Sequence, residues 1–183
     1  MNFSCVDSSA ISRIAEIDRT ELIQARYRCA LAPDGASIAL IERQLDPPEV
    51  FPDWDEEGIR RRAKWWQREV DEGGMLLIAE EEGELHGFAV LGPQKAGGCA
   101  EMVALFVDKS RRGKGLGTEL VRRLEDEARR RGIENIYVQS VDTVASVDFY
   151  RSVGYSVMCL MDSSTVHLPG METNIALAKR FQD

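Results

Sequence analysis

Cysteine and histidine are scarce in this sequence, which argues against a metal centre. Only two histidines occur in 183 residues, and the four cysteines lie far apart, at Cys5, Cys29, Cys99 and Cys159. Structural zinc sites use closely spaced cysteine and histidine ligands, and the sequence has no such cluster and no CxxC pair. We therefore expect no metal, and we interpret the cysteines as reduced thiols of a cytoplasmic protein.

Long apolar runs and an excess of positive charge are also missing. No apolar run approaches the ~20 residues that cross a bilayer, and the first residues, MNFSCVDSSAISR, lack the apolar core of a signal peptide. Lysine and arginine number 23 against 31 aspartates and glutamates, so the net charge is −8. A general nucleic-acid binder would carry a basic surface. We expect neither a membrane nor a nucleic acid as partner.

The one long basic run has a local explanation. Residues 129–131 are all arginine, and each follows an acidic residue of the segment 125–127 by four positions. This spacing and order favour ion pairs along a helix, and arginines at a helix end complement its dipole. The run therefore indicates a solvated helix end.

The rest of the composition is that of a folded domain, with 44% hydrophobic and 30% charged residues. Apolar periodicity predicts a mixed α/β (α+β) fold with one crossover helix. The predicted helices cover residues 11–25, 56–72, 116–131 and 144–153. The predicted strands cover residues 75–79, 85–91, 99–107, 136–139, 155–161 and 173–178, and a hairpin around Pro33-Asp34-Gly35 pairs residues 27–31 with 38–45.

Two proline-rich stretches and two tryptophans mark the region after that hairpin. Residues 46–48 and 51–53 are predicted to form a connector. Trp66 lies on the apolar stripe of the next helix and is expected in the core. For Trp65 we leave open core packing or contact with an aromatic or cationic amine.

The central stretch, residues 101–155, carries the chemistry. It contains Arg-Gly-Lys-Gly-Leu-Gly-Thr at residues 112–118, between an apolar strand and a helix. A glycine loop that leads into a helix presents free N–H groups and partial positive charge, which suits a phosphate. The Walker pattern fails because no lysine follows Gly117, and in the dinucleotide pattern the third glycine falls one position early. The pattern [RQ]-x-x-G-x-[GA] fits fully.

This stretch resembles the GNAT superfamily of acyl-CoA-dependent N-acyltransferases. The resemblance depends on three motifs in order: Leu-Phe-Val-Asp at 105–108, the glycine loop, and Phe-Tyr-Arg-Ser-Val-Gly-Tyr at 149–155. It implies a GNAT fold, with a central, mostly antiparallel mixed sheet that is flanked by helices and splayed at an acetyl-CoA cleft. It also implies a single domain, in which residues 1–74 form a variable acceptor-side region with an inserted hairpin and residues 75–183 form the acetyl-CoA-binding core.

The resemblance further implies which residues hold acetyl-CoA, the expected co-substrate. The loop and the following helix N-terminus would hold the pyrophosphate, the strand before the loop would bind pantetheine through its backbone, and the later helix would touch the coenzyme. These positions are Leu105, Phe106, Val107, Arg112, Gly113, Lys114, Gly115, Gly117, Thr118 and Ser146. The family's tyrosine, here Tyr150, can act as general acid to the leaving thiolate.

Glu101 is the candidate general base. It stands at the start of the strand before the loop, at the distance where histone-acetylating members of the family carry a catalytic glutamate. Side chains alternate between the two faces of a strand, so Glu101 is expected on the same face as Leu105 and Val107. Two alternatives remain open. Glu101 can be a solvated carboxylate at a strand end, and Tyr150 can be a core aromatic.

The sequence does not identify the acceptor. We expect a primary amine of a small molecule, because no pattern in the sequence indicates a basic or peptide-binding groove. A protein or peptide N-acetyltransferase and a non-catalytic acetyl-CoA-binding module are the alternatives. A homodimer is possible, with the terminal strands as candidate contacts.

Overall fold

The computed structural model describes residues 1–31, 37–51, 55–162 and 173–181. The chain divides into two compact units, each built from separated segments. The first contains Met1–Glu21, Pro52–Tyr137 and Arg180–Asp183, and the second contains Leu22–Phe51 and Val138–Lys179. Both units therefore draw residues from either side of position 74.

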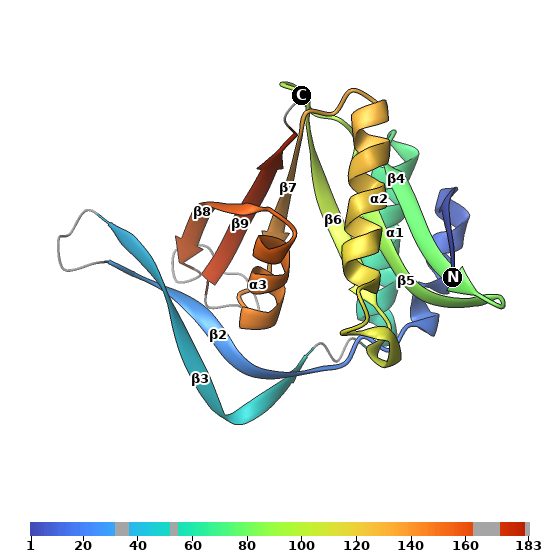
Figure 1. The fold of residues 1–183 in the computed structure, drawn as a ribbon. Helices are drawn as coiled ribbons and strands as arrows, with labels where there is room; N and C mark the ends of the chain where they lie inside the picture. The colour runs from blue at the N-terminus through green and yellow to red at the C-terminus, as the bar shows by residue number, and fades with distance from the viewer. Residues whose placement is uncertain (32–36, 52–54, 163–172, 182–183) are drawn as a thin grey trace. The chain divides into compact units, whose positions relative to one another are not determined.

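The first unit is built on a sheet with the strand order β1-β4-β5-β6-β7 (Figure 1). Its antiparallel strands are β1 (Asn2–Val6), β4 (Met75–Glu81), β5 (Glu84–Leu91) and β6 (Cys99–Val107). The next strand, β7 (Asn135–Ser140), starts in this unit and runs parallel to β6. A parallel neighbour requires a crossover, and α2 (Leu116–Arg130) supplies it.

Helices cover both faces of this sheet. On one face, η1 (Ser8–Glu16) and α1 (Glu56–Asp71) enclose an apolar cluster with the sheet, to which Ile14, Trp66 and Phe88 belong. On the other face lies α2 (Figure 1). Gly87 in β5 permits this close packing, because a Cβ there would lie 2.9 Å from a methyl carbon of Leu120.

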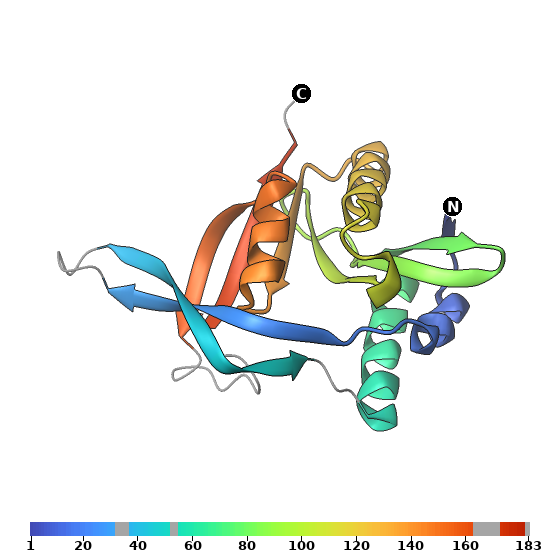
Figure 2. The same cartoon turned by 60° about the horizontal axis from the view of Figure 1, so that its bottom comes forward.

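The second unit contains a long hairpin and the end of the sheet. The hairpin pairs β2 (Glu21–Leu31) with β3 (Ile38–Phe51), and the two ribbons run side by side in both views (Figures 1 and 2). The strand order in the sheet continues as β7-β9-β8. Here α3 (Val144–Ser152) follows β7, and β8 (Ser156–Asp162) pairs antiparallel with β9 (Thr173–Arg180).

The predicted fold class is confirmed: the protein is a mixed α/β structure with a mostly antiparallel sheet flanked by helices. The predicted helix 56–72, the strands from residue 75 onward and the crossover helix are all present. The turn predicted at Pro33-Asp34-Gly35 lies outside the described residues. No helix in the described part of the chain has the length and hydrophobicity needed to cross a membrane.

The helix predicted over residues 11–25 is wrong in its second half. It is a 3₁₀ helix that ends at Glu16, and β2 begins at Glu21. The buried residues Ile11, Ile14 and Ile17 recur every three positions, which is the repeat of a 3₁₀ helix. Asp18 then accepts hydrogen bonds from the backbone N–H (2.9 Å) and hydroxyl (2.7 Å) of Thr20, a local turn that replaces further helix.

Two further elements depart from the prediction. The expected connector at 46–48 is part of β3, which continues to Phe51 through a cis Asp46–Pro47 bond. The strand β1 was missed, because its five residues, NFSCV, are mostly exposed and lack a clear apolar alternation. It pairs with β4 at the edge of the sheet.

Candidate functional site

The glycine loop passes through two left-handed glycines before α2 begins. A short 3₁₀ helix, η2 (Lys109–Arg111), precedes it, and Gly113 and Gly115 adopt the left-handed φ values of 71° and 81°. Gly115 is the N-cap of α2 and provides no side-chain hydrogen bond to the helix. The first N–H groups of a helix have no partner within it, so they are available to a ligand at this end.

The space in front of these glycines is open. A Cβ built on Gly113 or Gly115 would meet no heavy atom within 4 Å. Gly113, Lys114, Gly115 and Thr118 are exposed, and Gly117, in the first turn of α2, is half-buried. Glycine is therefore required for the backbone conformation, and the absent side chains leave the loop's outer surface accessible.

The two cationic side chains of the loop are folded back onto the protein. The Arg112 guanidinium donates to the carbonyl oxygens of Val107 (3.0 Å), Thr20 (2.8 Å) and Asp18 (3.4 Å). The Lys114 ammonium donates to the carbonyl oxygen of Ser110 at 2.9 Å. In this structure both side chains therefore brace the loop.

The strand before the loop, β6, is paired with β5 along one edge near the loop. Leu105, Phe106 and Val107 pair with Ala89, Phe88 and Gly87 of β5. Phe106 also packs its ring in the core, 5.4 Å from Phe88 and 5.8 Å from Trp66 between ring centroids. The ladder between β6 and β7 consists of three residue pairs, from Cys99 with Asn135 to Glu101 with Tyr137.

Glu101 lies at the end of that short parallel ladder. Its side chain is 13% exposed, and its Oε2 accepts a hydrogen bond from the Tyr137 hydroxyl at 2.8 Å. The same oxygen forms an ion pair with the Lys95 ammonium at 3.3 Å. Glu101 is therefore a largely buried carboxylate with two donors on one oxygen, which differs from the solvated strand-end alternative.

Sequence reasoning missed Lys95 and Tyr137. Lys95 lies in the loop between β5 and β6 and Tyr137 in β7, 42 positions apart. Only the register that places Tyr137 opposite Glu101 could have brought the tyrosine to attention. Nothing in the local sequence marks Lys95.

The remaining predicted residues belong to the second unit. Thr143 is the N-cap of α3, and its Oγ1 accepts a hydrogen bond from the backbone N–H of Ser146 at 3.3 Å. Tyr150 stacks edge-on against Phe149 and Tyr155, with centroid separations of 5.3 and 5.7 Å. Burial raises the pKa of Tyr150 above its ordinary value, so the phenol keeps its proton at neutral pH.

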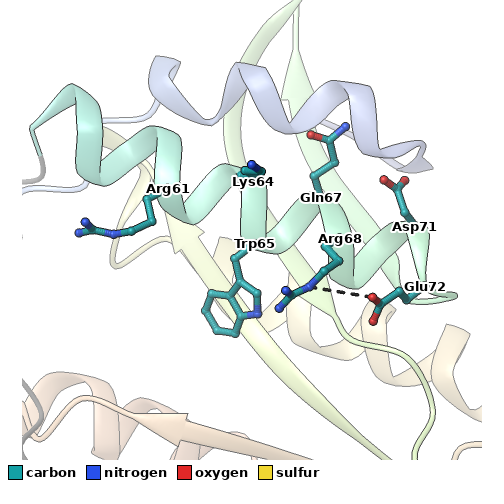
Figure 3. Close-up of a pocket in the computed structure, with 7 residues that line it drawn as sticks. All are labelled: Arg61, Lys64, Trp65, Gln67, Arg68, Asp71 and Glu72. Atoms are coloured by element: carbon teal, nitrogen blue, oxygen red, sulfur yellow. Dashed lines mark ion pairs between the residues drawn. The ribbon is translucent and has the colours of Figure 1, made fainter.

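Two hollows on the first unit involve other residues than the predicted site residues. Figure 3 shows one on the exposed side of α1, lined by Lys64, Trp65 and Arg68 among others. A second hollow lies between η1 and α1. The residues that line them belong to η1, to α1 and to Glu72, the C-cap of α1. None of the predicted site residues lines either hollow. Within the described residues, no group of three or more His, Cys, Asp or Glu side chains is placed to hold a metal ion.

Comparison with known families agrees with this geometry. Residues 38–155, which include the glycine loop and α3, match the Acetyltransferase (GNAT) family. The match covers more than half of the chain, and the chain belongs to this family.

Two curated relatives have assigned activities. Over 105 residues the chain is 32% identical to L-methionine sulfoximine/L-methionine sulfone acetyltransferase of Salmonella typhimurium (strain LT2), covering 55% of this chain and 61% of that protein. Over 115 residues it is 30% identical to L-amino acid N-acyltransferase MnaT of Escherichia coli (strain K12), covering 59% and 66%. The chain thus spans just under two thirds of the length of these relatives.

A solved structure resembles the whole chain. A Bacillus anthracis str. Ames protein in complex with acetyl coenzyme A has a TM-score of 0.75 and 17% sequence identity, covering 98% of this chain and 99% of that one. At this identity the likeness establishes the fold alone.

Proposed function

We propose that this protein is an N-acetyltransferase that transfers the acetyl group of acetyl-CoA to a primary amine of a small molecule. The observation that carries the proposal is the loop at residues 113–116. Two left-handed glycines lead into a helix whose N-cap has no side chain, and its outer surface is open. Backbone N–H groups at a helix N-terminus bind phosphate, and the coenzyme A pyrophosphate is the anion expected in this family.

The proposed coenzyme site extends from this loop in both directions. Gly113, Gly115, Gly117 and Thr118 would contact the pyrophosphate through the backbone, and Arg112 and Lys114 would brace the loop as they do here. The edge of Leu105, Phe106 and Val107 that faces away from β5 would hydrogen-bond the pantetheine. Ser146 would contact the coenzyme from α3. The Bacillus anthracis protein was solved with acetyl coenzyme A bound, which supports the identity of the ligand.

The reaction requires three events. The acceptor ammonium loses a proton, and its nitrogen forms a bond to the acetyl carbonyl carbon. The carbon–sulfur bond then breaks while that nitrogen gives up a second proton and the sulfur takes one up, so that coenzyme A leaves as a thiol. Glu101 is the proposed general base for the first event. Tyr150 is the proposed general acid for the last, and burial, which raises its pKa, leaves the phenol protonated at neutral pH. The activities named for the two curated relatives support a small amine as acceptor.

Release of free thiol from acetyl-CoA tests the activity. Purified protein is incubated with acetyl-CoA and a panel of L-amino acids and small amines, and the acetylated product is identified by mass spectrometry. Thiol release that depends on one of the amines is the expected result. A mass increase on peptides but on none of the small amines would favour the protein acetyltransferase alternative, and binding of acetyl-CoA without transfer would favour the non-catalytic module.

The substitution Gly115→Glu tests the coenzyme site directly. The added carboxylate would project into the open space in front of the loop and repel the pyrophosphate, so acetyl-CoA binding should be lost in calorimetry. Gly132→Glu is the matched control, because Gly132 also has a left-handed φ (77°) and open space, but lies beyond the other end of α2. Both variants carry similar backbone strain of about 1 kcal/mol. Unchanged affinity in Gly115→Glu would contradict the assignment of the loop.

A further inference from the structure

The side chains of Lys95 and Tyr137 meet at one carboxylate oxygen of Glu101, and the three residues come from separate segments of the first unit. Tyr137 in β7 donates to Glu101 Oε2 at 2.8 Å, and Lys95 in the loop before β6 approaches the same atom at 3.3 Å. The Lys95 ammonium also donates to the Tyr137 hydroxyl oxygen and lies 5.1 Å from the centre of its ring. Each of the three side chains therefore contacts the other two, and we call this arrangement the triangle.

The backbone holds each corner of this triangle. Lys95 donates its N–H to the carbonyl oxygen of Cys99 at 2.7 Å, and Gly92 donates to the carbonyl oxygen of Glu101 at 2.8 Å. These bonds close the loop at residues 92–98 onto the start of β6. Tyr137 stands opposite Glu101 in the parallel ladder. The meeting of the three side chains is thus built into the loop closure and the strand register.

We propose that Lys95 and Tyr137 are positioning residues that hold the Glu101 carboxylate in one orientation for its work as general base. This inference rests on the proposed function. An ammonium has only donors, and the Tyr137 hydroxyl donates to the same oxygen of Glu101, so both partners act on that oxygen as donors. Two charge-assisted contacts fix the carboxylate plane better than one, and misplacement by about 1 Å can cost about 100-fold in rate.

The titration behaviour of the two partners agrees with these roles. The hydrogen bond to Tyr137, followed by that to Glu101, raises the pKa of Lys95, so it remains an ammonium at neutral pH. Burial is the main cause that raises the pKa of Tyr137, with a further increase from Glu101 and a decrease from Lys95. Both groups remain protonated donors across the physiological range.

A different role for Lys95 can be separated by kinetics. Its ammonium occupies a position on Glu101 that a substrate ammonium would also favour, so it can either position the base or compete with the acceptor. A positioning residue changes kcat, whereas a competitor changes the KM for the amine. The geometry of the triangle, with Tyr137 holding the ammonium as well, favours positioning.

Steady-state kinetics with the acceptor amine identified by thiol release test the inference. Lys95→Met and Tyr137→Phe should each lower kcat about 10- to 100-fold with the KM for acetyl-CoA unchanged. Lys95→Arg, which keeps the cation, should restore most of the loss. Lys64→Met removes the same charge from an exposed position on α1 and should leave kcat unaltered. A wild-type kcat in Lys95→Met, or a lower KM for the amine alone, would overturn the proposal, as would a wild-type kcat in Glu101→Gln.

A second readout does not require catalysis. Tyrosine ionisation is followed by ultraviolet absorbance at alkaline pH, and the signal of Tyr137 is assigned as the difference from Tyr137→Phe. Glu101→Gln removes a cause that raises the pKa of Tyr137 and should lower it, and Lys95→Met removes a cause that lowers it and should raise it. If neither variant moves the Tyr137 titration, the triangle does not exist in solution. Should the wild type transfer no acetyl group, the proposed function fails, and this titration still decides whether the three groups are coupled.

Discussion

At the scale of single residues, the two adjacent tryptophans of α1 show how position on a helix decides the fate of identical side chains. Trp66 is 2% exposed and packs against Phe88 and Phe106, as predicted for the apolar stripe. Trp65 is 40% exposed and donates to a Glu69 carboxylate oxygen at 2.9 Å. One step along a helix rotates the side chain by about 100°, so only one of the pair reaches the core.

The pair allows a matched test of the core. Trp66→Ala should lower the free energy of unfolding by about 3–5 kcal/mol, because it leaves a cavity beside two aromatic rings. Trp65→Ala should cost less than about 1 kcal/mol, since it removes one exposed hydrogen bond. Urea unfolding followed by circular dichroism measures both. Equal losses in the two variants would contradict the placement of Trp66 in the core.

At the scale of elements, α2 combines a buried apolar face with a dense charged face. The predicted pairs Glu125–Arg129 (3.6 Å) and Glu127–Arg131 (3.1 Å) are present. The third predicted pair is wrong: Asp126 contacts Arg122 and Arg129 in place of Arg130. Several arginines are within reach of each carboxylate on a helix surface, and the choice among them depends on side-chain conformations that spacing alone does not fix.

Glu119, in the first turn of α2, makes the pH dependence of this element testable. Hydrogen bonds from Arg122 and Arg123 lower its pKa to about 2. A lowered carboxyl pKa contributes stability that is complete above its ordinary value near 4.5 and is lost as the pH falls towards 2. Glu119→Gln should therefore be less stable than the wild type at pH 7, by no more than about 1 kcal/mol at this exposed site.

The difference between Glu119→Gln and the wild type should shrink below pH 4.5 and disappear near pH 2. Urea titrations at several pH values measure it. Glu57→Gln removes a charge from the first turn of α1 and controls for the helix dipole alone. A difference that stays constant between pH 7 and pH 2 would show that the two arginines do not hold Glu119 in solution.

At the scale of the whole molecule, the chain forms two units that are stabilised differently. The first contains the large apolar cluster around Trp66 and Phe88. The second contains a buried ion pair in which the Arg26 guanidinium contacts the fully buried Asp142. Arg26 also donates to Glu49 of β3 at 2.9 Å, and the backbone N–H of Thr173 donates to Asp142 at 3.2 Å. This network joins the hairpin to β9 and to the start of α3.

Removal of Arg26 should affect the second unit selectively. Arg26→Met leaves the buried Asp142 without its cation, and such losses cost about 3–5 kcal/mol. Hydrogen exchange should become faster in β2, β9 and the first turn of α3, while β4 and β5 keep their protection. Arg28→Met is the matched control, because Arg28 is more exposed on the same strand. A uniform loss of protection across both units would show that they unfold together.

Features that depend on neighbouring residues could be predicted from the sequence alone. The glycine loop, the helix behind it and the strands from residue 75 onward follow from local propensity and periodicity. The family could be predicted for the same reason, since its three motifs are short segments. The first third of the chain was less legible, because a repeat of three suits a 3₁₀ helix as well as an α-helix and the exposed strand β1 has no pattern.

Which distant groups meet became known only from the folded chain. Arg112 turns back to the carbonyl oxygens of Asp18 and Thr20, more than 90 positions earlier in the sequence. Lys95, Glu101 and Tyr137 come together because a loop closes on β6 and a crossover helix returns the chain to a parallel neighbour. Contacts of this kind depend on register and topology, which no local window of sequence contains. The glycine loop could therefore be predicted from the sequence, whereas the contacts of Lys95 and Tyr137 with Glu101, the proposed base, could not.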